Sequence, residues 1–196
     1  ICGYMDVPGG ITLSLPSSFM GRWRFETAQF VEPETMAKRI DAKEDHPAYA
    51  CGPFAHPDEV LTVMETEEPY AFHMAYFYAT NPIAPTVYAE PERWYNALMK
   101  MDFNAAQDCF MTPTIMGLCD LVLPVSGFAE HDGVVLPHFG RNTHFLGAMN
   151  AALDPGEARS DLEIDLLVGK RLNPEAWPWE SAEEFFNAQI RTQYDR

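Results

Sequence analysis

Apolar residues recur at regular spacing along most of the chain after residue 55, and much less regularly before it. Within residues 58–66 the apolar positions follow helical spacing, which predicts a helix. Residues 71–78 form instead a nearly continuous apolar and aromatic run of strand length, typical of a strand buried on both faces. Pro82 follows shortly after this run, and proline cannot continue a central strand.

Predicted helices and strands alternate along roughly the next 50 residues. The pattern predicts a helix at residues 91–100, a weak strand at 103–107, a helix at 112–118 and a strand at 121–125. Strands and helices that alternate in this way are joined by right-handed crossovers. We therefore expect an α/β fold with a doubly wound, mostly parallel sheet and flanking helices (Rossmann-like).

Two further helices are predicted from their first residues. Ser160 and Ser181 are each followed three residues later by a glutamate and then by an apolar periodic segment. This is the spacing of a capping box, in which serine and glutamate satisfy the free backbone amides of the first turn. The predicted helices cover residues 161–172 and 182–192.

Residues 1–55 are rich in glycine, proline and charge, and we expect an extended or irregular leading segment of the same domain. One or two polar helices are expected around residues 32–44. Residues 56–196 then form the α/β domain. The chain begins in mid-motif without a methionine, so we expect a piece of a longer protein, with any signal peptide outside it. Cytoplasmic and periplasmic locations both stay open.

Composition excludes several classes of protein. A net charge of −16 leaves nothing to neutralise a run of phosphates, which argues against nucleic acid as a partner. A hydrophobic fraction of 47% excludes a largely disordered chain, and no apolar run is long enough for a membrane span. The four cysteines form no Cys-x-x-Cys pair, which argues against a zinc or iron–sulfur site within this chain.

Polar residues follow the first two predicted strands. Asn81 could offer a donor and an acceptor to a purine or pterin edge, or it could form a turn before proline. Asp108 has two carboxylate oxygens that match the two neighbouring N–H donors of guanine, or it could cap the following turn. Ligands of open α/β sheets bind beyond the carboxyl ends of strands, where the strand order reverses.

Three further residues have both a functional and a structural interpretation. Thr112 and Thr114 could bind a phosphate or ribose at a helix N-terminus, or simply cap that helix. His131 lies in a loop after the third strand and could donate to a phosphate or act as an acid or base, although surface loop histidines are commonly inert. We expect Asn81, Asp108 and His131 to line one crevice and to be at least partly exposed. The sequence shows no partnered nucleophile, P-loop or Gly-x-Gly-x-x-Gly.

The order of several motifs resembles a specific family. A strand ending in Asn-Pro is followed by a strand with Asp-x-Phe-x-Thr-x-Thr, then by Leu-Pro with Glu-x-x-Gly, and later by Pro-Gly-Glu-Ala-Arg-x-Asp. The segments that carry the resemblance are residues 2–10, 75–82, 106–114, 120–133, 140–141 and 155–172. In order and spacing they resemble the molybdopterin oxidoreductases that carry two molybdopterin guanine dinucleotides, the group of nitrate reductases, formate dehydrogenases and dimethyl sulfoxide reductase.

The resemblance implies the third domain of such a catalytic subunit, one of two Rossmann-like lobes that flank the cofactor. It implies a bis-(molybdopterin guanine dinucleotide) cofactor with molybdenum or tungsten, and no catalytic or metal-ligating residue in this chain. A 4Fe–4S cluster would be bound by residues outside the chain. Asp108 would meet the guanosine end. The implied cofactor contacts are Asn81, Gln107, Asp108, Thr112, His131 and Asp161.

Three departures from the family pattern stand out. The stretch from Thr114 to Asp120 is one residue longer than usual, His131 stands where many members have lysine, and Cys119 stands where alanine is usual. A histidine at position 131 does not carry the fixed positive charge of a lysine. We interpret Cys119 as a packing residue.

As a function, the resemblance implies a fragment of a molybdenum or tungsten oxidoreductase, inactive by itself and of a kind that serves anaerobic respiration. Its partners would be the remaining domains of the same subunit and an iron–sulfur electron-transfer subunit. The substrate stays open. One alternative is a non-catalytic α/β binding or interaction module. Another is an ordinary nucleotide-binding enzyme, which the missing glycine-rich loop disfavours.

Overall fold

The structure is a computed structural model that describes residues 7, 32–40, 45, 55–84, 90–135 and 147–194. The chain forms two compact units: Ile1–Phe25 with Ser126–Arg196 is unit 1, and Glu26–Val125 is unit 2. The domain boundary expected between residues 55 and 56 stays a prediction, because residues 46–54 lie outside the described part. Of the expected helical region at 32–44, residues 32–40 are described, and within them lies one short helix, α1 (Pro33–Met36). Of the segments carrying the family resemblance, residues 2–10 (apart from Val7) and 140–141 also lie outside the described residues.

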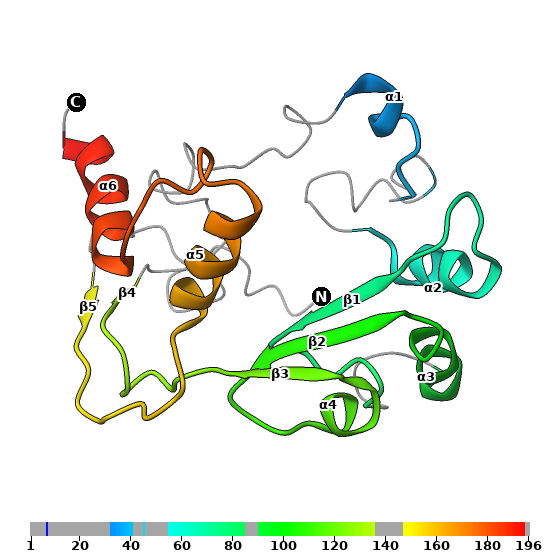
Figure 1. Ribbon diagram of the computed structural model, residues 1–196, viewed down its shortest axis with the longest axis horizontal. Coiled ribbons are helices and arrows are strands. Elements are labelled where there is room, and N and C mark those ends of the chain that lie inside the picture. Colours follow the sequence, from blue (N-terminus) through cyan, green and yellow to red (C-terminus); the bar gives the residue numbers. More distant parts are fainter. Residues whose placement is uncertain are drawn as a thin grey trace. The chain divides into compact units, whose positions relative to one another are not determined.

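Unit 2 is built on a parallel sheet of three strands in the order β1-β2-β3 (Figure 1). These are β1 (Met74–Tyr78), β2 (Phe103–Asp108) and β3 (Leu121–Pro124). The expected α/β class with a parallel sheet and flanking helices is confirmed. The described strands of this sheet follow one another in chain order. The place where the strand order of a doubly wound sheet reverses is therefore not among them.

β1 differs from its prediction in length and in burial. It begins at Met74 rather than at residue 71, because β2 begins at Phe103, the register partner of Met74. Only Phe77 is buried in β1, so the expectation of a strand buried on both faces is wrong. β1 lies at the edge of the three-stranded sheet, and a run of aromatic residues does not reveal whether a strand is central or lateral.

Three helices flank this sheet, and each begins with proline in its first turn, where the missing N–H costs no hydrogen bond. They are α2 (Pro57–Thr66), α3 (Pro91–Leu98) and α4 (Pro113–Leu118). All three were predicted within a few residues.

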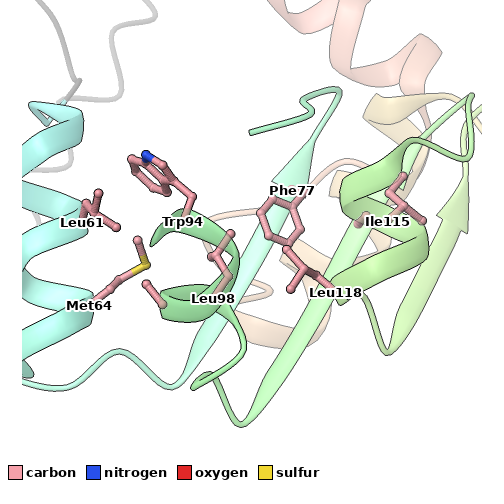
Figure 2. Close-up of a cluster of buried hydrophobic side chains, with 9 residues drawn as sticks. Leu61, Met64, Phe77, Trp94, Leu98, Ile115 and Leu118 are labelled. Atoms are coloured by element: carbon pink, nitrogen blue, oxygen red, sulfur yellow. The ribbon is translucent and has the colours of Figure 1, made fainter. Parts of the chain in front are cut away.

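One hydrophobic core joins these helices to one face of the sheet. Phe77 and Ala106 are register partners in adjacent strands, and both belong to the core cluster. Figure 2 shows Phe77 between Leu98 of α3 and Leu118 of α4, while Leu61 and Met64 of α2 lie beside α3. The helix residues of the cluster are Leu61, Met64, Trp94, Ala97, Leu98, Ile115 and Leu118.

The other face of the sheet carries large apolar side chains in contact with solvent. Because side chains alternate along a strand, the neighbours of Phe77 in β1 point away from the helices. Met74, Tyr76 and Tyr78 are 52%, 42% and 47% exposed, and Phe103 and Leu121 are exposed as well. We call these five residues the outer sheet face.

The described part of unit 1 contains a two-stranded antiparallel ladder and two helices. β4 (Gly133–Val135) pairs with β5 (Gly147–Met149), and the sequence did not predict this ladder because strands of three residues show no periodicity. α5 (Asp161–Leu172) has the predicted bounds, and α6 (Ala182–Tyr194) extends two residues beyond its predicted end. Both sides of the predicted capping box at Ser160 are present.

Aromatic residues pack between α5 and α6. Gly169 of α5 lies against the ring of Trp177, so close that a Cβ atom there would be 2.3 Å from Cδ2 of the ring. Trp177 packs edge-on against Trp179 at a centroid distance of 6.5 Å, and Trp179 packs edge-on against Phe185 at 4.8 Å. Edge-to-face contacts of this kind stabilise aromatic pairs beyond simple burial.

Among the described residues, no helix combines the length and the apolar character needed to cross a lipid bilayer.

Candidate functional site

Asn81 lies three residues beyond β1, and its side chain is tied to the first turn of α4. Its Oδ1 accepts hydrogen bonds from Oγ1 and from the backbone amide of Thr114, at 2.6 and 3.2 Å. The assignment of the oxygen follows from the backbone N–H of Thr114, which can only donate. Within residues 55–84 and 90–135, no acceptor lies within hydrogen-bond distance of the Asn81 amide nitrogen, so neither of its two N–H donors is used there.

Asp108 is the last residue of β2 and is partly exposed. Its Oδ1 accepts a hydrogen bond of 2.9 Å from the backbone amide of Phe110, which is the turn-capping interaction considered from the sequence. No hydrogen bond to Oδ2 occurs in the described part of unit 2. The two interpretations of Asp108 are therefore compatible, because one oxygen caps the turn and the other is left to accept.

Thr112 is the N-cap of α4, and its Oγ1 accepts from the backbone amide of Ile115 at 3.3 Å. Asn81 takes the amide of Thr114, so two of the first amides of this helix already have acceptors. The capping interpretation of Thr112 is thus seen directly. Its contact with a cofactor stays a prediction.

Gln107 precedes Asp108 in β2 and lies on the same side of the sheet as its register partner Tyr78, but it is fully buried. Its Oε1 accepts a hydrogen bond from the hydroxyl of Tyr76, two residues before its register partner Tyr78. This hydrogen bond links the side chains of β1 and β2 near the carboxyl ends of the two strands. A direct cofactor contact by Gln107 stays a prediction.

The parallel register brings the residues of unit 2 to one sheet edge. Tyr78 pairs with Gln107 and Asp108 pairs with Pro124, so the strands end together. Asn81 and Asp108 leave the sheet at this carboxyl edge, which confirms that part of the expectation. Both side chains are partly exposed, as expected, and so is His131.

Unit 1 places His131 in a loop that follows β3 and precedes β4. Its Nδ1 lies 2.9 Å from Oγ of Ser126, a residue that is only 3% exposed. Because His131 and Asp108 belong to different units, a common crevice stays a prediction.

Asp161 is the first residue of α5. A hydrogen bond between backbone groups links the start of this helix to the segment that leads into the His131 loop. Ser126 donates its N–H to the carbonyl of Arg159 at 2.9 Å. The following residue, Ser160, is the N-cap of α5 and accepts from the amide of Glu163. Two predicted contact residues of unit 1, His131 and Asp161, are thus positioned by one hydrogen-bonded segment.

Cys119 follows α4 and packs against the hydrophobic core. Burial raises the pKa of the Cys119 thiol, and the negative charge of Asp120 raises it further. The thiol therefore stays protonated near neutral pH, as a packing residue does. Nowhere in the described ranges do three or more His, Cys, Asp or Glu side chains gather in a way that could hold a metal ion.

Sequence reasoning did not identify Ser126 and Tyr76, which hold two of the predicted site residues. Ser126 stands five residues before His131, and no helical or strand spacing relates them. Tyr76 and Gln107 come together only through the pairing of β1 with β2. A register prediction for that pair is the one signal that could have found Tyr76.

Comparison with known proteins gives a consistent result. A family profile described as molybdopterin oxidoreductase matches residues 34–169. Acetylene hydratase of Syntrophotalea acetylenica is 30% identical over 138 residues, which is 69% of this chain and 18% of that protein. The solved structure of acetylene hydratase from Pelobacter acetylenicus superposes with a TM-score of 0.59 at 29% identity, covering 68% of this chain and 18% of the other. The chain thus spans less than a fifth of the length of these relatives.

Proposed function

Since this chain belongs to the molybdopterin oxidoreductase family, we propose that it binds the guanosine end of a molybdopterin guanine dinucleotide within a larger catalytic subunit. The observation that carries the proposal is the carboxyl edge of the sheet, where Asp108 keeps one carboxylate oxygen and Asn81 keeps one amide group for a ligand. These residues fit a guanine dinucleotide, because its base offers N–H donors and a carbonyl acceptor side by side.

In this proposal Asp108 accepts the two neighbouring N–H donors of guanine. Oδ2 accepts one, and Oδ1 accepts the other with the lone pair that the Phe110 amide does not use. Hydrogen bonds to a charged acceptor contribute about 1.5–3 kcal/mol each. The amide nitrogen of Asn81 donates to a carbonyl oxygen of the purine or pterin.

The other predicted contacts have supporting roles. Thr112 fixes the first turn of α4 beside the base, and Gln107 stiffens the strand end through Tyr76. His131 donates to a phosphate, and Asp161 completes the contacts from the start of α5. A bound bis-(molybdopterin guanine dinucleotide) would supply redox chemistry through molybdenum or tungsten.

We further propose that the remaining domains of the same subunit complete the site and bind a 4Fe–4S cluster, with an iron–sulfur electron-transfer subunit as partner and anaerobic respiration as the setting. These 196 residues alone would then be inactive. Nitrate or sulfoxide reduction, reductive dehydroxylation and formate oxidation all fit such a subunit. The name of the acetylene hydratases adds hydration of acetylene to these candidates.

The test uses the full-length subunit and the variants Asp108→Ala and Asp108→Asn. Guanine nucleotide released from the purified protein and bound molybdenum or tungsten are both measured. We expect both variants to lose most of the cofactor. The melting temperature of the cofactor-free protein should change less, because Asp108 contributes only one turn-capping hydrogen bond to it. Asp102→Ala is the matched control, because Asp102 lies just before β2 at the opposite sheet edge, paired with the exposed His73. Normal cofactor content in Asp108→Ala would show that Asp108 only caps its turn.

A further inference from the structure

Ser126 presents a buried hydroxyl group to the ring of His131. The residue is 3% exposed, and its backbone amide is already bonded to the carbonyl of Arg159. Its Oγ lies 2.9 Å from Nδ1 of His131. This contact joins a side chain in the interior of unit 1 to a partly exposed ring.

The burial of Ser126 decides how the hydrogen atoms are distributed. A buried hydroxyl needs an acceptor, and Nδ1 of His131 is the acceptor within hydrogen-bond distance. In a neutral imidazole one nitrogen accepts and the other carries the proton. The Ser126 hydroxyl therefore donates to Nδ1, and Nε2 carries the N–H.

The loop around His131 holds this arrangement in place. Glu130 closes the loop on Gly127, with a hydrogen bond of 2.7 Å from the Gly127 amide to Oε2 and one of 2.9 Å from the Glu130 amide to the Gly127 carbonyl. The side chain of Asp132 accepts a hydrogen bond of 2.8 Å from the amide of Ala151. The carbonyl of Ala129 accepts one of 2.8 Å from the amide of Ala152. These bonds fix the backbone on both sides of His131, and the contact with Ser126 is the one that orients its ring.

We propose that Ser126 is a positioning residue that fixes His131 in the Nε2–H tautomer, so that Nε2 donates a hydrogen bond to a phosphoryl oxygen of the bound dinucleotide. This inference rests on the proposed function. A fixed N–H donor binds an anionic oxygen whether or not the ring is protonated, because Nε2 carries a proton in both states. A histidine held in this way therefore does not need the permanent charge of a lysine.

The experiment is a double-mutant cycle on the full-length subunit prepared without cofactor. The dissociation constant for GDP is measured by calorimetry for the wild type, Ser126→Ala, His131→Ala and the double variant. We expect Ser126→Ala to weaken GDP binding roughly threefold to tenfold, the range of a single coupled interaction. In the His131→Ala background the same substitution should have no further effect. Ser126→Thr, which keeps a hydroxyl, should bind like the wild type.

Ser181→Ala is the control, because Ser181 is an exposed serine at the start of α6 in the same unit. Additive losses in the double variant, or unchanged affinity in Ser126→Ala, would overturn the positioning role. If Ser126→Ala does not fold, Ser126→Cys replaces it, and affinity equal to that of the wild type overturns the role as well. A wild-type subunit that binds no GDP contradicts the proposed function itself, whereas normal wild-type binding with additive variants contradicts only the role of Ser126.

Discussion

The side-chain oxygen of Asn81 accepts two hydrogen bonds from Thr114, one from its hydroxyl at 2.6 Å and one from its backbone amide at 3.2 Å. Thr114 is fully buried, and its Oγ1 in turn accepts from the amide of Ile83 at 3.3 Å. The chain that leaves β1 is thereby connected to the helix that follows β2. The oxygen of this side chain thus stabilises the fold, while its nitrogen makes none of these hydrogen bonds.

Because the oxygen and the nitrogen of the Asn81 amide make different contacts, two substitutions of Asn81 should have different effects. Asn81→Ala should destabilise the protein by about 1–3 kcal/mol, because the buried Thr114 hydroxyl loses its acceptor. Asn81→Asp keeps an acceptor oxygen and should retain most of the stability, but it loses the amide donors and should lower cofactor content. Denaturant unfolding and nucleotide release measure the two properties separately. Equal loss of cofactor and stability in both variants would refute this difference.

Gly169 is predicted to tolerate no side chain. The Cβ of Gly169→Ala would overlap the ring of Trp177, and overpacking of this kind costs about 1–3 kcal/mol. Gly117→Ala, in α4, is the matched control, because its Cβ would meet Tyr95 at an ordinary 3.6 Å. Alanine favours a helix over glycine, so this variant should be as stable as the wild type or more so. Thermal unfolding of both variants tests the contrast.

The N-cap of α5 should matter more than the corresponding serine of α6. Ser160 is buried, its hydroxyl accepts from the amide of Glu163, and its backbone amide donates to the Glu163 carboxylate. Ser160→Ala should therefore cost about 1 kcal/mol of stability. Ser181 accepts from the amide of Glu184 but is exposed, and its substitution by alanine should cost less. Comparable losses in the two variants, measured by urea unfolding, would contradict this order.

The link between α2 and α3 should weaken in acid. Arg93 donates two hydrogen bonds to the carboxylate of Glu65, at 2.8 and 2.6 Å, and these bonds lower the pKa of Glu65. A carboxyl whose pKa is lower in the folded state adds stability above its unfolded pKa, and this contribution disappears as the pH falls through the folded value. The free energy of unfolding of Arg93→Ala should therefore approach that of the wild type below about pH 4. A difference that is the same at pH 3 and pH 7 would exclude this explanation.

Local signals explain which elements could be predicted from the sequence. Ser160 and Glu163 mark the start of α5 within four residues of chain, and the helix has the bounds expected from them. The helices that begin with proline were found for the same reason. β1 was predicted too long, because its length depends on where β2 begins, 29 residues after Met74. It was predicted too deeply buried, because its burial depends on what covers the side of the sheet that carries Tyr76 and Tyr78.

The candidate site shows the same limit. The carboxyl edge with Asn81 and Asp108 follows from the parallel direction of the strands, which the sequence predicted. The bonds that Asn81 makes to Thr114, and those of His131 to Ser126, depend on side-chain directions that no periodicity encodes. The sequence therefore predicted candidate residues but not the groups to which they are hydrogen-bonded.

The outer sheet face has a consequence for how these 196 residues behave in solution. Five large apolar side chains in contact with water favour attraction between molecules, whereas a net charge of −16 keeps molecules apart. Added salt screens the repulsion and leaves the attraction in place, since the screening length falls from roughly 30 Å at 0.01 M to roughly 3 Å at 1 M. The colloidal stability of this stretch of chain should thus be greatest in dilute buffer and should fall as salt is added, the reverse of a protein that aggregates through attraction between opposite charges.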